Sequence, residues 1–274
     1  MNKKVIYVFA LIFTVIIMIG TMSAIYSSDN DDANTTNQDD TFVVGFSCLF
    51  PPFGYQTDDG QYAGFDLDLA KEVAKRNNWT FKAQPIISWD TKEVELNSDV
   101  VDCIWSEFTI DGRENDYTWS NPYFNNTQVI VVKSDSDINS FDDLKGKTVE
   151  VEITSSGIDT LNENKTLKET FGEVNEINDY ETGFMDLDSE VCDALIVDIG
   201  CAKYHIVEKY SNESFKILDQ PLKNEKYGVA FKKGNDELRN QVQKTLDEMF
   251  EDGTVDRIAQ NYSDYGIPER LIYP

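Results

Sequence analysis

Histidine and basic residues are scarce in this 274-residue chain, and each shortage removes a class of function. A single His excludes His-rich metal sites and leaves His205 as the one candidate for a His-dependent triad. It lies inside a helical segment with no partner nearby in sequence, which favours a packing or surface role. Only 24 Lys and Arg stand against 50 Asp and Glu, a net charge of −26. This balance argues against nucleic-acid binding, because phosphate contacts need clustered cations, and against an anionic membrane surface.

Proline and glycine are also few, with 7 and 15 residues, while 41% of the chain is hydrophobic and 12% aromatic. A mostly disordered chain would hold fewer apolar residues, so we expect a folded protein. The length allows one large domain or two lobes, each with its own core.

The common catalytic and metal-binding motifs are absent as well. The segment 145–148 (KGKT) resembles the end of a phosphate loop, but Phe141 stands where the leading Gly is required. The segment 45–49 (GFSCL) fails as a nucleophile elbow because it ends in Leu. No acidic run has the spacing of a calcium loop. We therefore expect neither a metal nor a cofactor.

The N-terminus has the pattern of an export segment. Lys3 and Lys4 precede an apolar run that continues to Tyr26, long enough for a signal peptide or a membrane anchor. No Cys follows until Cys48, which argues against a lipoprotein. We predict a signal peptide or anchor over 1–26, a disordered linker over 27–41, and an extracytoplasmic location, either secreted or anchored to the cell membrane.

From residue 42 onward, strand-like and helix-like segments alternate. This predicts an α/β fold with mostly parallel sheets, which bind ligands beyond the carboxyl ends of their strands. The expected strands are 42–46, 100–105, 129–133, 148–153, 194–197 and 227–231. The expected helices are 65–77, a short one opened by the S-x-x-D capping box at 140–143, 200–210, one capped by Asn235 and ended by Gly253, and 254–262.

Polar and aromatic residues gather just after these strands, as in a ligand pocket. Two prolines stiffen the aromatic loop 50–55, and Ser88–Trp89–Asp90 follows another apolar segment. Arg113 ends the polar segment 106–113 and suits bidentate capture of a carboxylate. Asp198 ends an apolar strand and suits a cation, although it is also placed to cap the next helix. An Arg for a carboxylate, an Asp for an ammonium and aromatic walls amount to an α-amino-acid site.

The chain resembles the extracellular solute-binding proteins of family 3, which feed polar amino acids to ABC transporters. The resemblance covers 42–265 in the family's order and rests on FPPFGY (50–55), YAGFDLDLAKEVAKR (62–76), FTIDGREN (108–115), WSNPYF (119–124), FDDLKGKTVEV (141–151), ALIVD (194–198), YGVAFKKGNDELR (227–239) and EDGTVDRIAQNY (251–262). It implies a periplasmic-binding-protein-like fold, in which two α/β lobes joined by a two-strand hinge close on the ligand. Lobe one would hold 42–125 and 224–274, and lobe two 126–223.

The resemblance also assigns ligand contacts. Phe53 and Trp89 would be aromatic walls. Thr109 and Arg113 would bind the α-carboxylate with help from Ser156 of the other lobe, and Asp198 would bind the α-ammonium. The predicted set is completed by the polar side chains Ser106, Glu107, Glu152 and Ser155. Phe50 and Tyr55 are expected to be packing residues.

Three positions depart from the family's pattern. Ser47 stands where an acidic residue is frequent, and Glu152 where Gln or Lys is common. Glu107 stands where the family has a small residue, frequently Gly, whose backbone amide faces the ligand's carboxylate. The Glu107 side chain either points away from the pocket or makes the pocket more acidic. If both Glu side chains face inward they need a cationic partner, which gives the hypothesis of a basic ligand such as Lys, Arg or ornithine.

The four cysteines are predicted to be free, buried thiols. A strand of about five residues separates Cys192 from Cys201, at roughly 3.3 Å per residue, which exceeds the ~7 Å that a disulfide allows between Cα atoms. Cys48 lies past the end of its strand, whereas Cys103 lies inside its own.

The leading hypothesis is therefore a binding protein and not an enzyme: a monomer that takes a free amino acid and works with a permease and an ATPase of an ABC importer. Two alternatives use the same fold. One is a dehydratase like the cyclohexadienyl or arogenate dehydratases, with Glu107 or Glu152 as the acid. The other is a ligand-sensing receptor subunit that would need another chain for its output.

Overall fold

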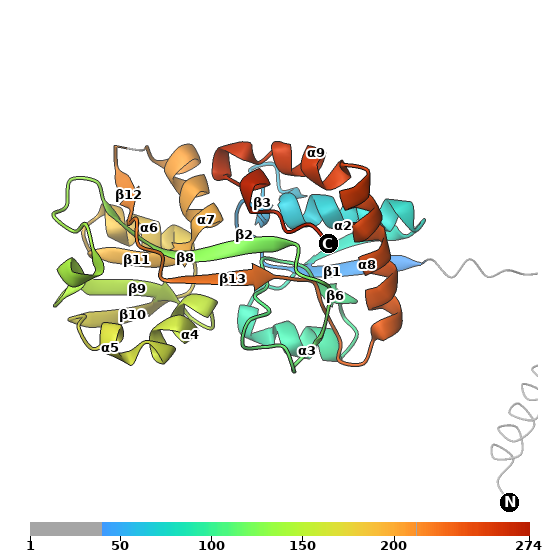
Figure 1. Cartoon of the computed structure of the whole chain (residues 1–274), viewed down its shortest axis with the longest axis horizontal. Helices are drawn as coiled ribbons and strands as arrows, with labels where there is room; N and C mark the ends of the chain where they lie inside the picture. The colour runs from blue at the N-terminus through green and yellow to red at the C-terminus, as the bar shows by residue number, and fades with distance from the viewer. Residues whose placement is uncertain (1–39, 212) are drawn as a thin grey trace, which may run out of the picture. The chain divides into compact units, whose positions relative to one another are not determined.

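The computed structural model describes residues 40–211 and 213–274. The predicted signal peptide or anchor lies outside these residues, as does all of the predicted linker except its last two residues. The described part forms two α/β lobes, each built around its own mixed sheet (Figure 1). The fold class expected from the sequence is confirmed.

Lobe one is built on a five-stranded sheet in the order β5-β1-β6-β14-β7. Its strands are β1 (Thr41–Phe46), β5 (Thr80–Pro85), β6 (Cys103–Ile104), β7 (Thr118–Trp119) and β14 (Ala230–Phe231). β1 pairs in parallel with β5 and β6, whereas β14 is antiparallel to β6 and β7. β6 is shorter than predicted because Val100 and Val101 still close the preceding helix, both donating to the Glu95 carbonyl.

Helices cover both faces of this sheet (Figure 1). They are α2 (Phe65–Arg76), η1 (Trp89–Thr91), α3 (Lys92–Asn97), α8 (Asp236–Glu251), α9 (Thr254–Gln260), η4 (Ser263–Tyr265) and η5 (Pro268–Arg270). The apolar residues of α2, such as Phe65, Leu69 and Val73, are buried, and Asn235 caps α8 as predicted by accepting from the Leu238 N–H. A small antiparallel sheet of β2 (Leu49–Phe50), β3 (Gly54–Gln56) and β4 (Tyr62–Ala63) shapes the loop after β1.

Lobe two holds a six-stranded sheet with helices on both faces. The order is β10-β9-β11-β8-β12, with β13 also paired to β8. The strands are β8 (Phe124–Lys133), β9 (Thr148–Glu152), β10 (Glu173–Ile177), β11 (Ala194–Asp198), β12 (Phe215–Ile217) and β13 (Lys223–Tyr227). The helices are η2 (Phe141–Leu144), α4 (Ser156–Glu163), α5 (Lys165–Lys168), α6 (Tyr180–Asp188), α7 (Ile199–Tyr204) and the π-helical turn η3 (His205–Lys209). The capping box at Ser140 and Asp143 is confirmed.

Two antiparallel strands connect the lobes. β8 and β13 pair from Phe124 with Tyr227 to Gln128 with Lys223, and both run between the lobes in Figure 1. Both start before the predicted strands at 129 and 227. The first half of β8 contains polar residues, which interrupt the apolar pattern. Asn126 donates to Asp198 and Gln128 to Glu225, so these polar side chains are satisfied inside the protein.

One cluster of buried apolar residues extends from lobe one into lobe two through this hinge. Phe53 lies within it, with its ring centroid 5.2 Å from that of Phe124 and 5.4 Å from that of Tyr227. The four cysteines are free thiols, as predicted, although Cys48 is only partly buried. Over residues 40–211 and 213–274, none of the helices has both the length and the apolarity that a bilayer crossing requires.

Candidate functional site

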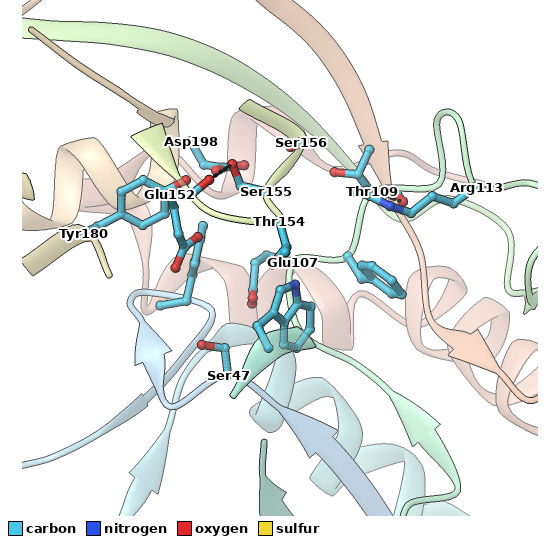
Figure 2. Close-up of a pocket in the computed structure, with 13 residues that line it drawn as sticks. Ser47, Glu107, Thr109, Arg113, Glu152, Thr154, Ser155, Ser156, Tyr180 and Asp198 are labelled. Atoms are coloured by element: carbon cyan, nitrogen blue, oxygen red, sulfur yellow. Dashed lines mark hydrogen bonds between the residues drawn. The ribbon is translucent and has the colours of Figure 1, made fainter. Parts of the chain in front are cut away.

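A cleft lies where the carboxyl ends of parallel strands from both sheets meet. Its lining from lobe one follows β1, β5 and β6, and its lining from lobe two follows β9, β10 and β11. The cleft is narrow in this structure, with a cavity volume of about 40 Å³. It is lined by Ser47, Phe50, Trp89, Glu107, Phe108, Thr109, Arg113, Glu152, Thr154, Ser155, Ser156, Tyr180 and Asp198 (Figure 2).

Arg113 and Thr109 lie at one end of this cleft (Figure 2). The Arg113 guanidinium carbon is 5.5 Å from the ring centroid of Phe108, and its Nη1 donates to the Thr109 carbonyl at 3.4 Å. Its Nη2 donates to Asp159 Oδ2 at 2.8 Å. The side chain of Arg113 is 19% exposed, and it is among the residues that line the cleft.

Asp198 lies at the other end and is buried, with 4% exposure. Its Oδ1 accepts from Asn126 Nδ2 and from the Tyr227 hydroxyl, both of which come from the hinge strands. The side chain does not cap α7, which removes the capping role considered from the sequence. Burial, followed by the nearby charge of Glu225, raises the pKa of Asp198 to about 7.

Glu107 points into the cleft between these two ends (Figure 2). Its φ of 42° lies in the left-handed region, which is strained for a non-glycine residue. Its backbone N–H donates to Asp66 Oδ2 at 2.6 Å, and its Oε2 accepts from the Ser106 hydroxyl at 2.7 Å. The amide is thus tied to α2 and does not face the cleft, and the side chain makes the cleft more acidic. Burial and the charge of Asp66 raise the pKa of Glu107 well above its usual range.

Glu152, at the end of β9, also lines the cleft beside Tyr180 (Figure 2). Burial is the main cause that raises its pKa to about 8, and the charges of Asp198 and Asp179 add to the shift. Among the described lining residues, three carboxylates therefore face one guanidinium. Ligand-free, such a cleft favours protonated carboxyls, and it favours a cation as ligand.

Eight of the ten residues predicted for the site line this cleft, and two do not. Phe53 is fully buried, because its ring fills the core among Phe65, Phe124 and Tyr227. Ser106 is also fully buried, and its hydroxyl accepts from the Ser47 N–H beneath the cleft. Phe53 therefore does not border this cleft as predicted, whereas Phe50 of the same loop does.

Phe50 both packs and lines the cleft, with its ring centroid 5.3 Å from that of Tyr180. The sequence predicts only a packing role for it. Four further lining residues are outside the predicted set: Ser47, Phe108, Thr154 and Tyr180. Ser47 and Thr154 follow strand ends that had been predicted, so their position was a usable signal. Tyr180 follows β10, a strand that had not been predicted.

Comparison with known proteins agrees with this architecture. The model of the bacterial extracellular solute-binding proteins, family 3, matches residues 42–265. The chain belongs to this family. It is 29% identical over 248 residues to the L-cystine-binding protein TcyJ of Escherichia coli strain K12, covering 89% of this chain and 91% of TcyJ. It is 28% identical to the arginine-binding extracellular protein ArtP of Bacillus subtilis, covering 80% and 85% of the two chains.

Solved structures of amino-acid-binding proteins also resemble the chain. A histidine-bound substrate-binding protein of an ABC uptake transporter from Streptococcus pneumoniae gives a TM-score of 0.78 at 30% identity, covering 81% of this chain and 92% of that one. An ancestral arginine-binding protein bound to arginine gives 0.75 at 34% identity, covering 81% and 98%. This family 3 protein therefore has the two-lobed binding-protein fold, and its family is one of extracellular proteins.

Proposed function

We propose that this family 3 protein binds a free basic amino acid in the cleft and, closed around it, delivers the amino acid to an ABC importer. The observation that carries the proposal is the excess of carboxylates, three against one guanidinium. Support for amino-acid binding comes from relatives named for cystine, histidine and arginine binding.

The two ends of the cleft suit the two charges of an amino-acid backbone. Arg113 and the Thr109 hydroxyl would take the α-carboxylate from lobe one, with Ser156 from lobe two. Asp198 of lobe two would take the α-ammonium. Because these groups belong to different lobes, the ligand makes its full set of contacts only in the closed state, which is the differential binding that drives closure.

The remaining carboxylates select the ligand's side chain. After Arg113 and Asp198 are matched by the zwitterion, Glu107 and Glu152 remain in the cleft without a cation. A guanidinium or ammonium on the ligand would supply it, and charged hydrogen bonds of this kind contribute about 1.5–3 kcal/mol each. A second carboxylate, as in cystine or glutamate, would find no second cation among the described lining residues.

A calorimetric titration tests the proposal. We expect Arg, Lys or ornithine to bind more tightly than Gln, and Glu to bind weakly or not at all. Glu152→Gln should weaken binding of the basic ligand by about 10-fold or more while affecting Gln little, because it removes a charge that only the basic side chain uses.

The matched control is Glu173→Gln, which removes an exposed carboxylate of β10 outside the cleft. It should leave the affinity unchanged. A preference for Glu or Asp, or equal weakening by both variants, would contradict the proposal.

The wider context of the protein is part of the same proposal. We infer that it acts by binding and not by catalysis, as a monomer, with a permease and an ATPase as partners. We also infer that the apolar segment 1–26 exports or anchors it. The lobe boundaries that we assign are 42–125 with 224–274, and 126–223. Sheet membership supports them to within a few residues, because β8 to β13, from Phe124 to Tyr227, share one sheet and β14 returns to the other.

The dehydratase alternative receives no support from the relatives reported above, which are named as binding proteins. Incubation with prephenate or arogenate, followed by absorbance of the aromatic product, should show no turnover.

A further inference from the structure

An ion pair bridges the two lobes at the mouth of the cleft. Arg113 Nη2 of lobe one lies 2.8 Å from Asp159 Oδ2 on α4 of lobe two. The side chain of Asp159 is 57% exposed, whereas that of Arg113 is 19% exposed. Asp159 is therefore the more exposed partner of the pair, and it is not among the residues that line the ligand cleft, whereas Arg113 is.

The helix that carries Asp159 also carries part of the ligand site. Ser155 caps α4 by accepting from the Ile158 N–H, and Ser156 is its first residue. Asp159 follows Ser156 by three positions, so the two side chains lie on one face of the helix. When α4 approaches lobe one, Ser156 reaches the cleft and Asp159 reaches Arg113 in the same movement.

A second positive charge near Arg113 favours an acidic residue at position 159. Lys92 is 8% exposed, and its Nζ lies 5.2 Å from the ring centroid of Trp89 and 5.9 Å from that of Phe108, the ring that Arg113 also faces. Burial and the charge of Arg113 lower the pKa of Lys92, while Asp159 is among the acids that raise it. Lys92, which is not among the residues that line the cleft, thus places a second cation near Arg113, and Asp159 offsets their repulsion.

We propose that Asp159 is a positioning residue for ligand binding: it fixes the Arg113 guanidinium for the ligand carboxylate and latches the two lobes together. The pair forms only when the lobes meet, so it stabilises the closed state relative to the open one. Arg113 has five N–H donors, and the contacts to Asp159 and Thr109 leave others for the ligand. This inference rests on the proposed ligand role of Arg113.

The test compares Asp159→Asn with the wild-type protein, using the basic amino acid that the titration above identifies. A partly exposed ion pair corresponds to an effect of up to about fivefold on an equilibrium constant. At 50 mM salt we expect Asp159→Asn to raise Kd by about two- to fivefold, mainly through faster dissociation in stopped-flow measurements. The difference should shrink at 500 mM salt, because screening weakens the pair. Asp159→Glu should restore part of the affinity.

The matched control is Glu163→Gln on the same helix. Its carboxylate pairs with Lys223 of the hinge at 3.0 Å and has no contact with Arg113, so this variant removes an equal charge and an ion pair. It should leave Kd and the dissociation rate unchanged. Equal or tighter binding by Asp159→Asn overturns the latch while the proposed function stands. If the wild-type protein binds no amino acid, the proposed function fails and the latch with it.

Discussion

Phe50 and Phe53 lie three residues apart in one aromatic loop, yet they face different surroundings. Phe53 is fully buried, and its ring packs between the lobes against Phe124 and Tyr227. Phe50 is 6% exposed and borders the cleft beside Tyr180. The sequence predicts that the loop follows β1 and carries aromatic rings. Which ring faces the ligand depends on the β2–β3 turn and on packing from the other lobe, and neither is visible in the sequence.

We predict that Phe53→Ala lowers the free energy of unfolding by about 3–5 kcal/mol, because it removes a ring from a closely packed core. The affinity of the molecules that remain folded should change much less. Trp89→Ala should lower the ligand affinity strongly and the stability only a little, since Trp89 is only partly buried and lines the cleft. Urea unfolding and calorimetric titration of both variants separate the two roles. A larger loss of affinity in Phe53→Ala than in Trp89→Ala would show that Phe53 contributes directly to ligand binding.

At the scale of elements, the strand ends carry the site, and this much could be predicted from the sequence. Asp198 follows the expected strand 194–197, Glu152 lies in the expected strand 148–153, and Arg113 comes after the expected strand 100–105. Trp89 follows β5, which is not among the expected strands. The direction of Glu107 could not be predicted. Its inward position depends on a left-handed backbone held by Asp66 of α2, a contact 41 residues away in sequence. The hinge ends of β8 and β13 do not follow from an apolar pattern, because they carry polar side chains that bond to each other and to Asp198.

α2 is placed by the glycine that precedes it. Gly64 has a φ of 136°, and a Cβ there would lie 2.0 Å from the Phe53 carbonyl oxygen. We therefore predict that Gly64→Ala destabilises the protein by about 3 kcal/mol or more, through strain and overpacking together. Because α2 carries Asp66, the position of Glu107 should also change, and affinity for the basic ligand should fall.

Gly234→Ala is the matched control for this glycine. Gly234 has a φ of 87°, but a Cβ there would meet no atom within 4 Å. Only the left-handed backbone then opposes the substitution, at a cost of about 1–2 kcal/mol. Thermal unfolding of the two variants should show the larger loss in Gly64→Ala. Equal losses would show that the contact with Phe53 relaxes freely.

At the scale of the whole molecule, ligand binding and protonation are linked through the acidic cleft. The pKa of Glu152 is raised to about 8 and that of Asp198 to about 7, in both cases chiefly by burial. A carboxyl whose pKa is raised on folding adds stability below its ordinary pKa, and this stability is lost as the pH rises through the folded value. The ligand-free protein should therefore lose this part of its stability between about pH 4 and pH 8. Glu152→Gln, which cannot ionise, should lose less.

A bound basic amino acid reverses this dependence, because its cation stabilises the ionised carboxylates. We predict that the rise in Tm produced by a saturating basic ligand increases from pH 5 to pH 8, and that binding at pH 7 releases protons. Calorimetric titrations in two buffers of different ionisation enthalpy measure that release directly. Glu152→Gln should release fewer protons, whereas Glu173→Gln should match the wild-type protein. A larger Tm shift at pH 5 than at pH 8, or proton uptake on binding, would show that the cleft carboxyls do not meet the ligand's cation. The excess carboxyl groups of the cleft would then have a role within the protein and would not bind the ligand's side chain.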